Sequence, residues 1–148
     1  MTLKIQIQED VKTAMRARDQ KRLTALRLIT AAIKQIEIDK RIEVDDQAVL
    51  AVLDKMVKQR RESLEQFEKA GRDDLAAQEN FELDLLSVYL PEALSDEEVA
   101  VLIKQALADT GASSIRDMGA VMNKLRGEVQ GRADMKAVSS AVKAQLGA

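Results

Sequence analysis

The chain has 148 residues, a formal net charge of −2, and a composition that is 46% hydrophobic but only 2% aromatic. It contains neither cysteine nor histidine, which excludes a disulfide framework, a Ser-His-Asp triad, a cysteine nucleophile and the usual zinc sites. No apolar run approaches the ~18 residues of a transmembrane helix, and the first residues lack the apolar segment of a signal peptide. We therefore expect a cytoplasmic protein that has no membrane association and no cofactor. A metal could still bind among carboxylates, but the acidic residues are dispersed among basic ones as on a solvated surface, so we expect no metal.

The residue frequencies favour helices over sheets. The chain has six glycines, one proline and 32% charged residues, and the common charged residues are good helix formers. The proline, Pro91, pushes Leu90 out of the α region and cannot continue a helix, and Ser95 to Glu98 then form a capping-box pattern that starts a new one. We predict an all-α protein with an N-terminal bundle of about four helices over residues 1–90 and a small three-helix domain over residues 91–148.

Apolar residues at spacings of three and four predict the helices before this joint. Their expected bounds are Leu3–Arg18, Asp19–Lys40, Asp45 or Asp46 to Ala70, and Asp73 or Asp74 to Tyr89. Asp19 is expected to cap the second helix, and Gly71 to stop the third. The apolar stripes predict that Met15 and Leu28 face the core together with Ile7, Leu26, Ile29, Ile33, Val49, Leu53, Met56 and Leu86.

One charged residue, Glu79, falls on the apolar stripe of the fourth predicted helix. Arg60 interrupts the stripe of the third helix in the same way. Buried charges are found mostly in pairs, so a pair between Arg60 and Glu79 across the bundle is one interpretation. The other is that Glu79 lies at the edge of its stripe and faces solvent.

Three shorter helices are predicted after the joint. The first runs from Asp96 to Asp109 and stops at Thr110-Gly111, the second is capped by Ser113 or Ser114, and the third is capped by Asp134. Gly127 and Gly131 are expected to bracket the turn between the last two helices.

Basic residues gather in two places. Residues 12–27 carry six basic residues against Asp19 alone, and the segment from Gly111 onward carries six basic residues against three acidic ones. Basic patches on an acidic protein are compatible with a polyanionic partner, although most charge runs are solvated surfaces. In the first place, Arg18, Lys21 and Arg22 surround the start of the second predicted helix, so they are secondary candidates for an anion site. Ion pairing with acidic residues of a neighbouring helix is the alternative.

The second place is the stronger candidate for nucleic-acid binding. Lys124, Arg126, Arg132 and Lys136 surround a glycine-bounded turn that leads into the last helix, and Gly119 and Gly131 would allow a close backbone approach. Gly119 inside a helix costs about 1 kcal/mol relative to alanine, so close approach of either a neighbouring helix or a nucleic-acid backbone would explain it. Asp134, as a cap, would already satisfy some amide groups of the last helix, which weakens a phosphate site there.

A serine–lysine pair is the one catalytic pattern present. Ser139 and Lys143 are four residues apart on the last predicted helix, but serine–lysine catalysis needs a desolvated lysine and an oxyanion hole. A short exposed helix supplies neither, so we assign no catalytic residue.

Short motifs in order along the chain resemble the YqeY-like family. They are Ala17-Arg18-Asp19, Arg22-Leu23, Leu26-Arg27, Arg61-Glu62-Ser63, the segment Ala70 to Ala76, Glu79, Glu82-Leu83, Tyr89-Leu90-Pro91, Asp117-Met118-Gly119, Val121-Met122 and Gly131-Arg132-Ala133-Asp134. The resemblance covers essentially the whole chain. Met135 departs from it, because glycine is expected there in the family.

The family is similar to the tail domain of the B subunit of glutamyl-/aspartyl-tRNA amidotransferase. The resemblance implies a helical bundle followed by a three-helix domain, and a module that contacts tRNA without performing chemistry. A carbon–nitrogen ligase activity with glutamine as amido-N-donor would then belong to the full amidotransferase complex. The rival hypothesis is an adaptor that docks on an aminoacyl-tRNA synthetase or amidotransferase without touching RNA. It requires an exposed apolar patch, for which Ile5, Ile38 and Ile42 are the candidates.

Overall fold

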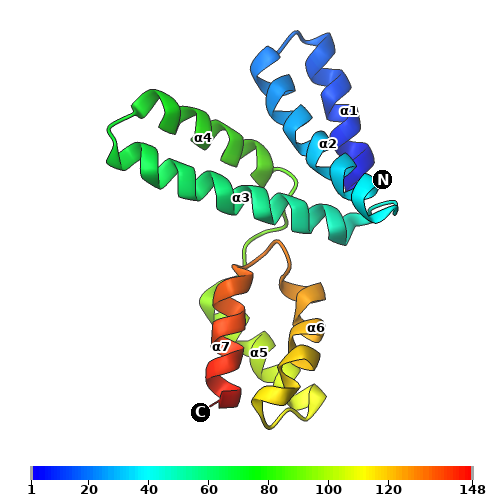
Figure 1. Cartoon of the computed structure of the whole chain (residues 1–148), viewed down its shortest axis with the longest axis vertical. Helices are drawn as coiled ribbons and strands as arrows, with labels where there is room; N and C mark the ends of the chain where they lie inside the picture. The colour runs from blue at the N-terminus through cyan, green and yellow to red at the C-terminus, as the bar shows by residue number, and fades with distance from the viewer. Residues whose placement is uncertain (1, 148) are drawn as a thin grey trace. The chain divides into compact units, whose positions relative to one another are not determined.

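The computed structural model describes residues 2–147, and these residues form seven α-helices, one 3-10 turn and no strand. Figure 1 shows the helices, whose bounds are α1 Leu3–Arg16, α2 Gln20–Lys40, α3 Asp46–Lys69, α4 Asp73–Ser87, α5 Asp96–Thr110, η1 Ile115–Asp117, α6 Met118–Val129 and α7 Met135–Gly147. The prediction of an all-α protein is therefore confirmed. The chain divides into two compact units, of which the first ends at Leu90 and the second begins at Pro91.

In the first unit, side-chain caps set the starts of the helices. Asp19 accepts a hydrogen bond from the amide of Arg22 at the start of α2, and Asp45 accepts one from Ala48 at the start of α3. The predicted end of the first helix at Arg18 is wrong by two residues, because Arg18 has a left-handed backbone with φ of 56°. Gly71, with φ of 69°, allows the chain to leave α3 as predicted.

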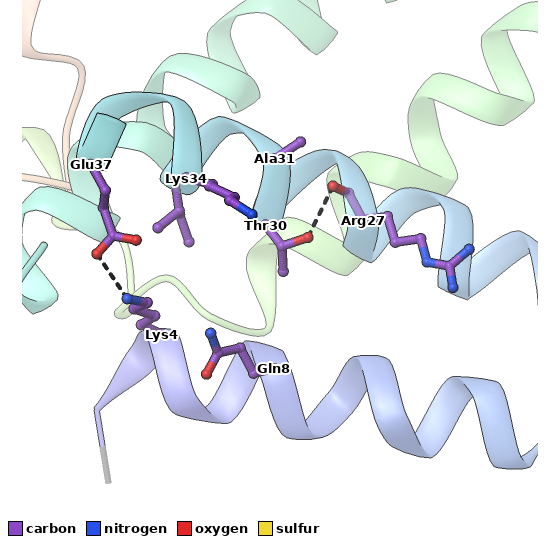
Figure 2. Close-up of a pocket in the computed structure, with 8 residues that line it drawn as sticks. Lys4, Gln8, Arg27, Thr30, Ala31, Lys34 and Glu37 are labelled. Atoms are coloured by element: carbon purple, nitrogen blue, oxygen red, sulfur yellow. Dashed lines mark hydrogen bonds and ion pairs between the residues drawn. The ribbon is translucent and has the colours of Figure 1, made fainter. Parts of the chain in front are cut away.

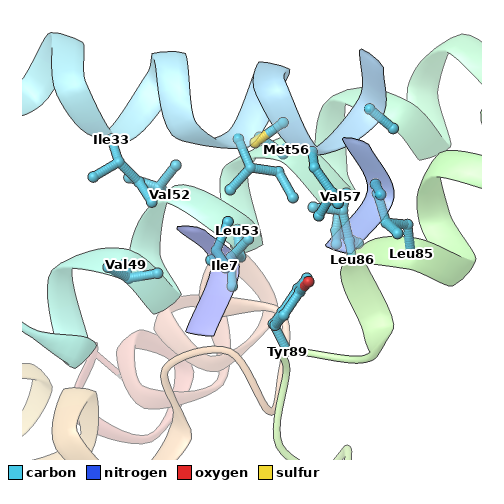
Figure 3. Close-up of a cluster of buried hydrophobic side chains, with 14 of the residues drawn as sticks. Ile7, Ile33, Val49, Val52, Leu53, Met56, Val57, Leu85, Leu86 and Tyr89 are labelled. Carbon is cyan, nitrogen blue, oxygen red and sulfur yellow. The ribbon is translucent and has the colours of Figure 1, made fainter. Parts of the chain in front are cut away.

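The core of the first unit draws side chains from all four helices. Figure 3 shows Ile7 of α1, Ile33 of α2, Leu53 of α3 and Leu86 of α4 around one apolar centre, and Tyr89 closes it after α4 ends. The Tyr89 hydroxyl donates a hydrogen bond to the Asp10 carboxylate of α1. Burial is the main reason that the pKa of Tyr89 is raised, and the Asp10 carboxylate raises it further. This contact ties the last residues of the unit to its first helix.

Two residues predicted in this core are exposed instead. Met15 is 51% exposed and Leu28 is 42% exposed. Both lie at the edge of a wide apolar stripe, where periodicity alone does not show how far the neighbouring helix reaches.

Of the two interpretations of Glu79, the ion pair with Arg60 is confirmed and the solvent-facing position is wrong, and Glu82 is a third member of this ion cluster. Arg60 Nη1 lies 3.7 Å from Glu79 Oε2, and Arg60 Nε lies 3.0 Å from Glu82 Oε2. Glu79 and Glu82 are only 8% and 9% exposed. One arginine thus faces two buried carboxylates between α3 and α4. Burial is the largest cause of the raised pKa of Glu79. The charge of Arg60 opposes this rise, and the charge of the nearby Glu82 adds to it.

The second unit begins with a capped helix and packs three helices on one apolar centre. Ser95 and Glu98 form the predicted capping box of α5, and Gly111 ends α5 with φ of 65°. The buried residues of this unit are Ile103, Ala106, Val121, Leu125, Val129, Val138 and Val142. The sixth predicted helix starts as a 3-10 turn, in which Asp117 accepts hydrogen bonds from the amides of Ser113 and Ser114.

The prediction that Gly127 borders the turn after this helix is wrong. α6 continues through Gly127 to Val129, because Val121, Leu125 and Val129 are fully buried at a spacing of four residues. Their burial outweighs the roughly 1 kcal/mol that a glycine costs inside a helix.

Candidate nucleic-acid interface

The outer face of α6 carries two glycines. Gly119, Asn123 and Gly127 recur every four residues and are exposed. A Cβ atom added at Gly119 or Gly127 would have no neighbour within 4 Å. Packing among the described residues therefore gives no reason for either glycine, and the interpretation that a neighbouring helix requires Gly119 finds no support. The α6 backbone is open to an outside partner along this face.

Lys124 lies on the side of this face that borders α5. Its Nζ atom is 3.2 Å from Asp109 Oδ2, and both side chains are about two-fifths exposed. Hydrogen bonds from Gln105 first and from Lys124 second lower the pKa of Asp109. An exposed ion pair of this kind is worth at most about 1 kcal/mol, so Lys124 can exchange Asp109 for another anion at small cost.

Arg126 points to a different side of α6 from Lys124, because residues two positions apart on a helix differ by ~200° around its axis. Its Nη1 atom donates a 3.4 Å hydrogen bond to Asn123 Oδ1, and both residues are exposed. At that length the bond is weak. Arg116, an exposed residue of the 3-10 turn just before α6, adds a cation near the start of the helix. Arg116 is one of the six basic residues after Gly111, and no motif in the sequence marked it as a candidate contact.

Arg132 and Gly131 have a structural role in the described chain. Arg132 Nε donates a 3.0 Å hydrogen bond to the carbonyl of Glu92, and the Arg132 carbonyl accepts a 2.8 Å bond from the amide of Leu94. These bonds fasten the segment after Pro91 to the turn between α6 and α7. Gly131 has φ of 78°, a left-handed conformation that glycine adopts without strain. The turn itself therefore accounts for both residues.

Lys136 is exposed in the first turn of α7. Its amide donates a 3.0 Å hydrogen bond to Asp134 Oδ1, so Asp134 caps the helix as predicted. The cap occupies an amide that an anion would otherwise use. Lys136 thus offers its side chain to a partner, while the helix end offers less than the sequence pattern indicated.

The secondary candidates form a corner with its own internal contacts. Lys21 Nζ lies 4.3 Å from the centre of the Phe81 ring, a cation–π contact between α2 and α4. Arg22 is half-buried, and its charge lowers the pKa of Tyr89 against the larger effect of burial. Arg18 occupies the left-handed turn before α2. In residues 2–147, none of the three forms an ion pair with a carboxylate, so the predicted alternative of ion pairing is not what holds them.

Ser139 and Lys143 lie on α7, Ser139 half-buried and Lys143 exposed. Across the described part of the chain no hydrogen bond links them, and no group of three or more Asp or Glu side chains is placed to hold a metal ion. None of the described helices is long and apolar enough to cross a membrane.

Comparison with known proteins decides the family. The model of the Yqey-like protein family matches residues 4–146. The chain belongs to the YqeY-like family. The match runs across both units, which agrees with the motifs found in order along the sequence.

Curated relatives carry the name "Altered inheritance of mitochondria protein 41, mitochondrial". The one from Pyrenophora tritici-repentis is 31% identical over 145 residues, which is 96% of this chain and 80% of that protein. The one from Eremothecium gossypii is 41% identical over 98 residues, 64% of this chain and 54% of that protein. The one from Kluyveromyces lactis is 37% identical over 107 residues, 70% of this chain and 57% of that protein. The matches thus span little more than half the length of the last two relatives.

Proposed function

We propose that this YqeY-like chain is a non-catalytic module that associates with tRNA through backbone phosphates. The observation that carries the proposal is the exposed α6 face, where Gly119 and Gly127 leave the helix backbone open and Lys124 and Arg126 flank it. The resemblance of the family to the amidotransferase tail supports tRNA as the partner. We propose the cytoplasm as its location, whereas the fungal relatives are named mitochondrial.

The geometry ranks the candidate contacts. Arg126 and Lys136 are exposed and hold only weak side-chain contacts or none in the described chain, so they are free to meet phosphates. Lys124 follows after it releases Asp109. Arg132 ranks last, because contact with RNA through its Nε would cost the bond to Glu92. Contacts of this kind position an RNA by its shape and charge rather than by its base sequence.

The test is tRNA binding by fluorescence anisotropy over a series of salt concentrations. The variant R126Q/K136Q removes two charges from the proposed surface, and K55Q/R61Q removes two exposed charges from α3 of the first unit as a matched control. Log affinity falls with log salt at a slope of about −0.9 per phosphate neutralised on a duplex and about −0.7 on a single strand. We expect R126Q/K136Q to lower the slope by about 1.4–1.8 and the control to leave it nearly unchanged.

Two results would contradict this proposal. Wild-type protein that shows no binding at micromolar concentration and near-physiological salt would remove tRNA as a partner of this chain. An equal effect of the two double variants would show that net charge, and not the α6 surface, attracts the RNA.

A second candidate function has its own observation. Ile38 is 61% exposed, Ile42 49% and Ile5 46%, so each isoleucine named for the protein-adaptor hypothesis is open to solvent. We propose, as this alternative, docking on an aminoacyl-tRNA synthetase or amidotransferase through these isoleucines. Isothermal titration calorimetry of either enzyme with the wild type, I38E/I42E and R126Q/K136Q separates the two functions. If the chain is an adaptor, I38E/I42E should lose binding to the enzyme and R126Q/K136Q should keep it.

A further inference from the structure

A groove of about 490 Å³ lies between α1 and α2 in the first unit. Figure 2 shows Lys4 and Gln8 on α1, Glu37 of α2 turned toward Lys4, and Thr30, Lys34 and Arg27 farther along α2, where Arg27 points away from Lys4. Three of these side chains are cationic and one is anionic. Neither the candidate RNA surface of the second unit nor the exposed isoleucines include any of the groove's cations.

The single carboxylate of the groove is already engaged. Glu37 Oε2 lies 2.8 Å from Lys4 Nζ and accepts a 3.2 Å hydrogen bond from the amide of Val44. The contact with Lys4, followed by that with Val44, lowers the pKa of Glu37. Glu37 therefore fixes Lys4 at one end of the groove and stabilises the turn before α3. Its charge is balanced by Lys4 and does not offset the other two cations.

Arg27 and Lys34 have no acidic partner in the described chain. The residues three or four positions from Arg27 are Leu23, Thr24, Thr30 and Ala31, so the helix supplies no carboxylate to it. The one acidic residue at that distance from Lys34 is Glu37, which pairs with Lys4. On α3 of the same unit, by contrast, Lys69 has Glu65 at 3.0 Å. The groove thus keeps two uncompensated positive charges.

The spacing of these two cations selects the kind of anion. Seven residues separate Arg27 from Lys34, which is about two helical turns and about 10.5 Å along α2, on nearly the same side of the helix. That separation suits several anionic groups in a row better than one isolated phosphate. From α1, on the opposite side of the groove, the Gln8 side chain contributes neutral N–H donors (Figure 2).

We propose that the α1–α2 groove binds a chain of phosphate groups, with Arg27 and Lys34 as its two contact points. Such a chain has two sources, a small polyphosphate such as a nucleoside triphosphate, or the backbone of an RNA strand. Gln8 donates to a phosphate oxygen from the α1 side of the groove. The hydroxyl of Thr30 donates to the carbonyl of Arg27 at 3.1 Å, so its oxygen only accepts, and it takes no part in holding the anion.

The experiment follows backbone amide signals of the ¹⁵N-labelled full chain by NMR. The protein is titrated without magnesium with inorganic tripolyphosphate, with inorganic orthophosphate, and with a ten-residue oligouridylate. We expect tripolyphosphate to shift the amide signals of Gln8, Thr30 and Lys34, and to bind more tightly than orthophosphate. R27Q/K34Q should weaken binding about tenfold, since two exposed ion pairs are lost. The control K55Q/R61Q removes the same charge from α3 and should change the affinity less than about twofold.

A variant with the opposite expected sign completes the test. E37Q removes the only negative charge of the groove and releases Lys4, so it should strengthen tripolyphosphate binding about threefold. Equal losses in R27Q/K34Q and K55Q/R61Q, or unchanged signals at Gln8, Thr30 and Lys34, would overturn the proposal. If oligouridylate shifts the same signals, the source is RNA; if only tripolyphosphate does, the source is a small polyphosphate. Tripolyphosphate binding with no tRNA binding would leave this proposal standing and remove the proposed function alone.

Discussion

Replacing Arg60 by methionine should destabilise the first unit strongly at neutral pH. Arg60 is the only cation within 4 Å of the Glu79 and Glu82 carboxylates among the described residues, and each carboxylate has a buried oxygen, Oε2, without a hydrogen-bond partner there. Breaking a buried ion pair by removing one partner costs about 3–5 kcal/mol. The Arg60 side chain is 26% exposed, so we expect the lower end, a loss of about 3 kcal/mol in the free energy of unfolding.

The measurement is urea unfolding followed by tyrosine fluorescence. The chain has one tyrosine and no tryptophan, and Tyr89 is buried in the core of the first unit, so the signal reports on that unit alone. With an m-value of about 1–1.5 kcal/mol/M, the midpoint should fall by about 2–3 M. R61M, which removes an exposed arginine from the next position of α3, is the matched control and should shift the midpoint by less than about 0.5 M.

The stability that R60M loses relative to wild type should be smaller at pH 5 than at pH 7. The pKa of Glu79 lies above its ordinary value of 4.5 in the folded chain. The Glu79 carboxylate of the folded chain therefore binds a proton more tightly than that of the unfolded chain. The stabilising contribution of the protonated form is complete below about pH 4.5 and is lost as the pH rises through the folded pKa. Removing Arg60 removes an influence that lowers this pKa. The difference between R60M and wild type should therefore shrink between pH 7 and pH 5.

The triple variant R60M/E79Q/E82Q tests whether unpaired buried carboxylates cause the loss, because it removes the two negative charges that R60M leaves without a partner. We expect it to recover most of the lost stability. A loss in R60M no larger than that in R61M, a loss equal at pH 7 and pH 5, or no recovery in the triple variant would each refute the role given to this ion cluster.

Two further predictions concern contacts that hold each unit. Y89F removes the hydrogen bond to Asp10 and leaves a half-buried carboxylate with one partner fewer, so urea unfolding followed by circular dichroism at 222 nm should show a loss of about 1.5–2 kcal/mol, because the lost bond is to a charged group. S95A removes the side-chain cap of α5 and should lower the stability of the second unit by about 1 kcal/mol, while the Tyr89 fluorescence transition of the first unit should not move.

The fold could be predicted from the sequence where local chemistry decides. Asp19, Asp45 and Ser95 cap helices as expected. An aspartate or serine just before an apolar helical repeat is a reliable signal of a helix start, because its side-chain oxygen can accept a hydrogen bond from an amide of the first turn. The end of the first helix and the extent of the sixth were predicted less well. A left-handed arginine at position 18 has no compositional signal, and burial of Val129 carries α6 past Gly127.

The candidate site could be predicted only as a set of residue types. The sequence placed Lys124 and Arg132 beside Arg126 and Lys136, but it could not show that Asp109 pairs with Lys124 or that Glu92 accepts from Arg132. Those partners lie 15 and 40 positions away in the chain, so no helical spacing indicates them. The α1–α2 groove was not predicted, because its two sides lie on different helices. The seven-residue spacing of Arg27 and Lys34 did indicate that both residues lie on nearly the same side of one helix.

The glycines of α6 separate a structural from a functional explanation of that helix. Gly127 is exposed, helical and without neighbours within 4 Å of an added Cβ, so G127A should stabilise the second unit by about 0.5–1 kcal/mol. G111A, at φ of 65°, should instead destabilise it by about 1 kcal/mol. Circular dichroism of thermal unfolding measures both changes.

If α6 meets an RNA backbone through its bare face, the same G127A change should weaken tRNA binding in the anisotropy assay, because a methyl group then stands where a phosphate approaches. A variant that is more stable and binds tRNA less tightly would fit a glycine kept for contact, since such a residue lowers stability and improves binding. A G127A protein that is more stable and binds tRNA as well as the wild type would contradict close approach along this face. RNA contact would then rest on the cationic side chains of Arg126, Lys136 and Lys124.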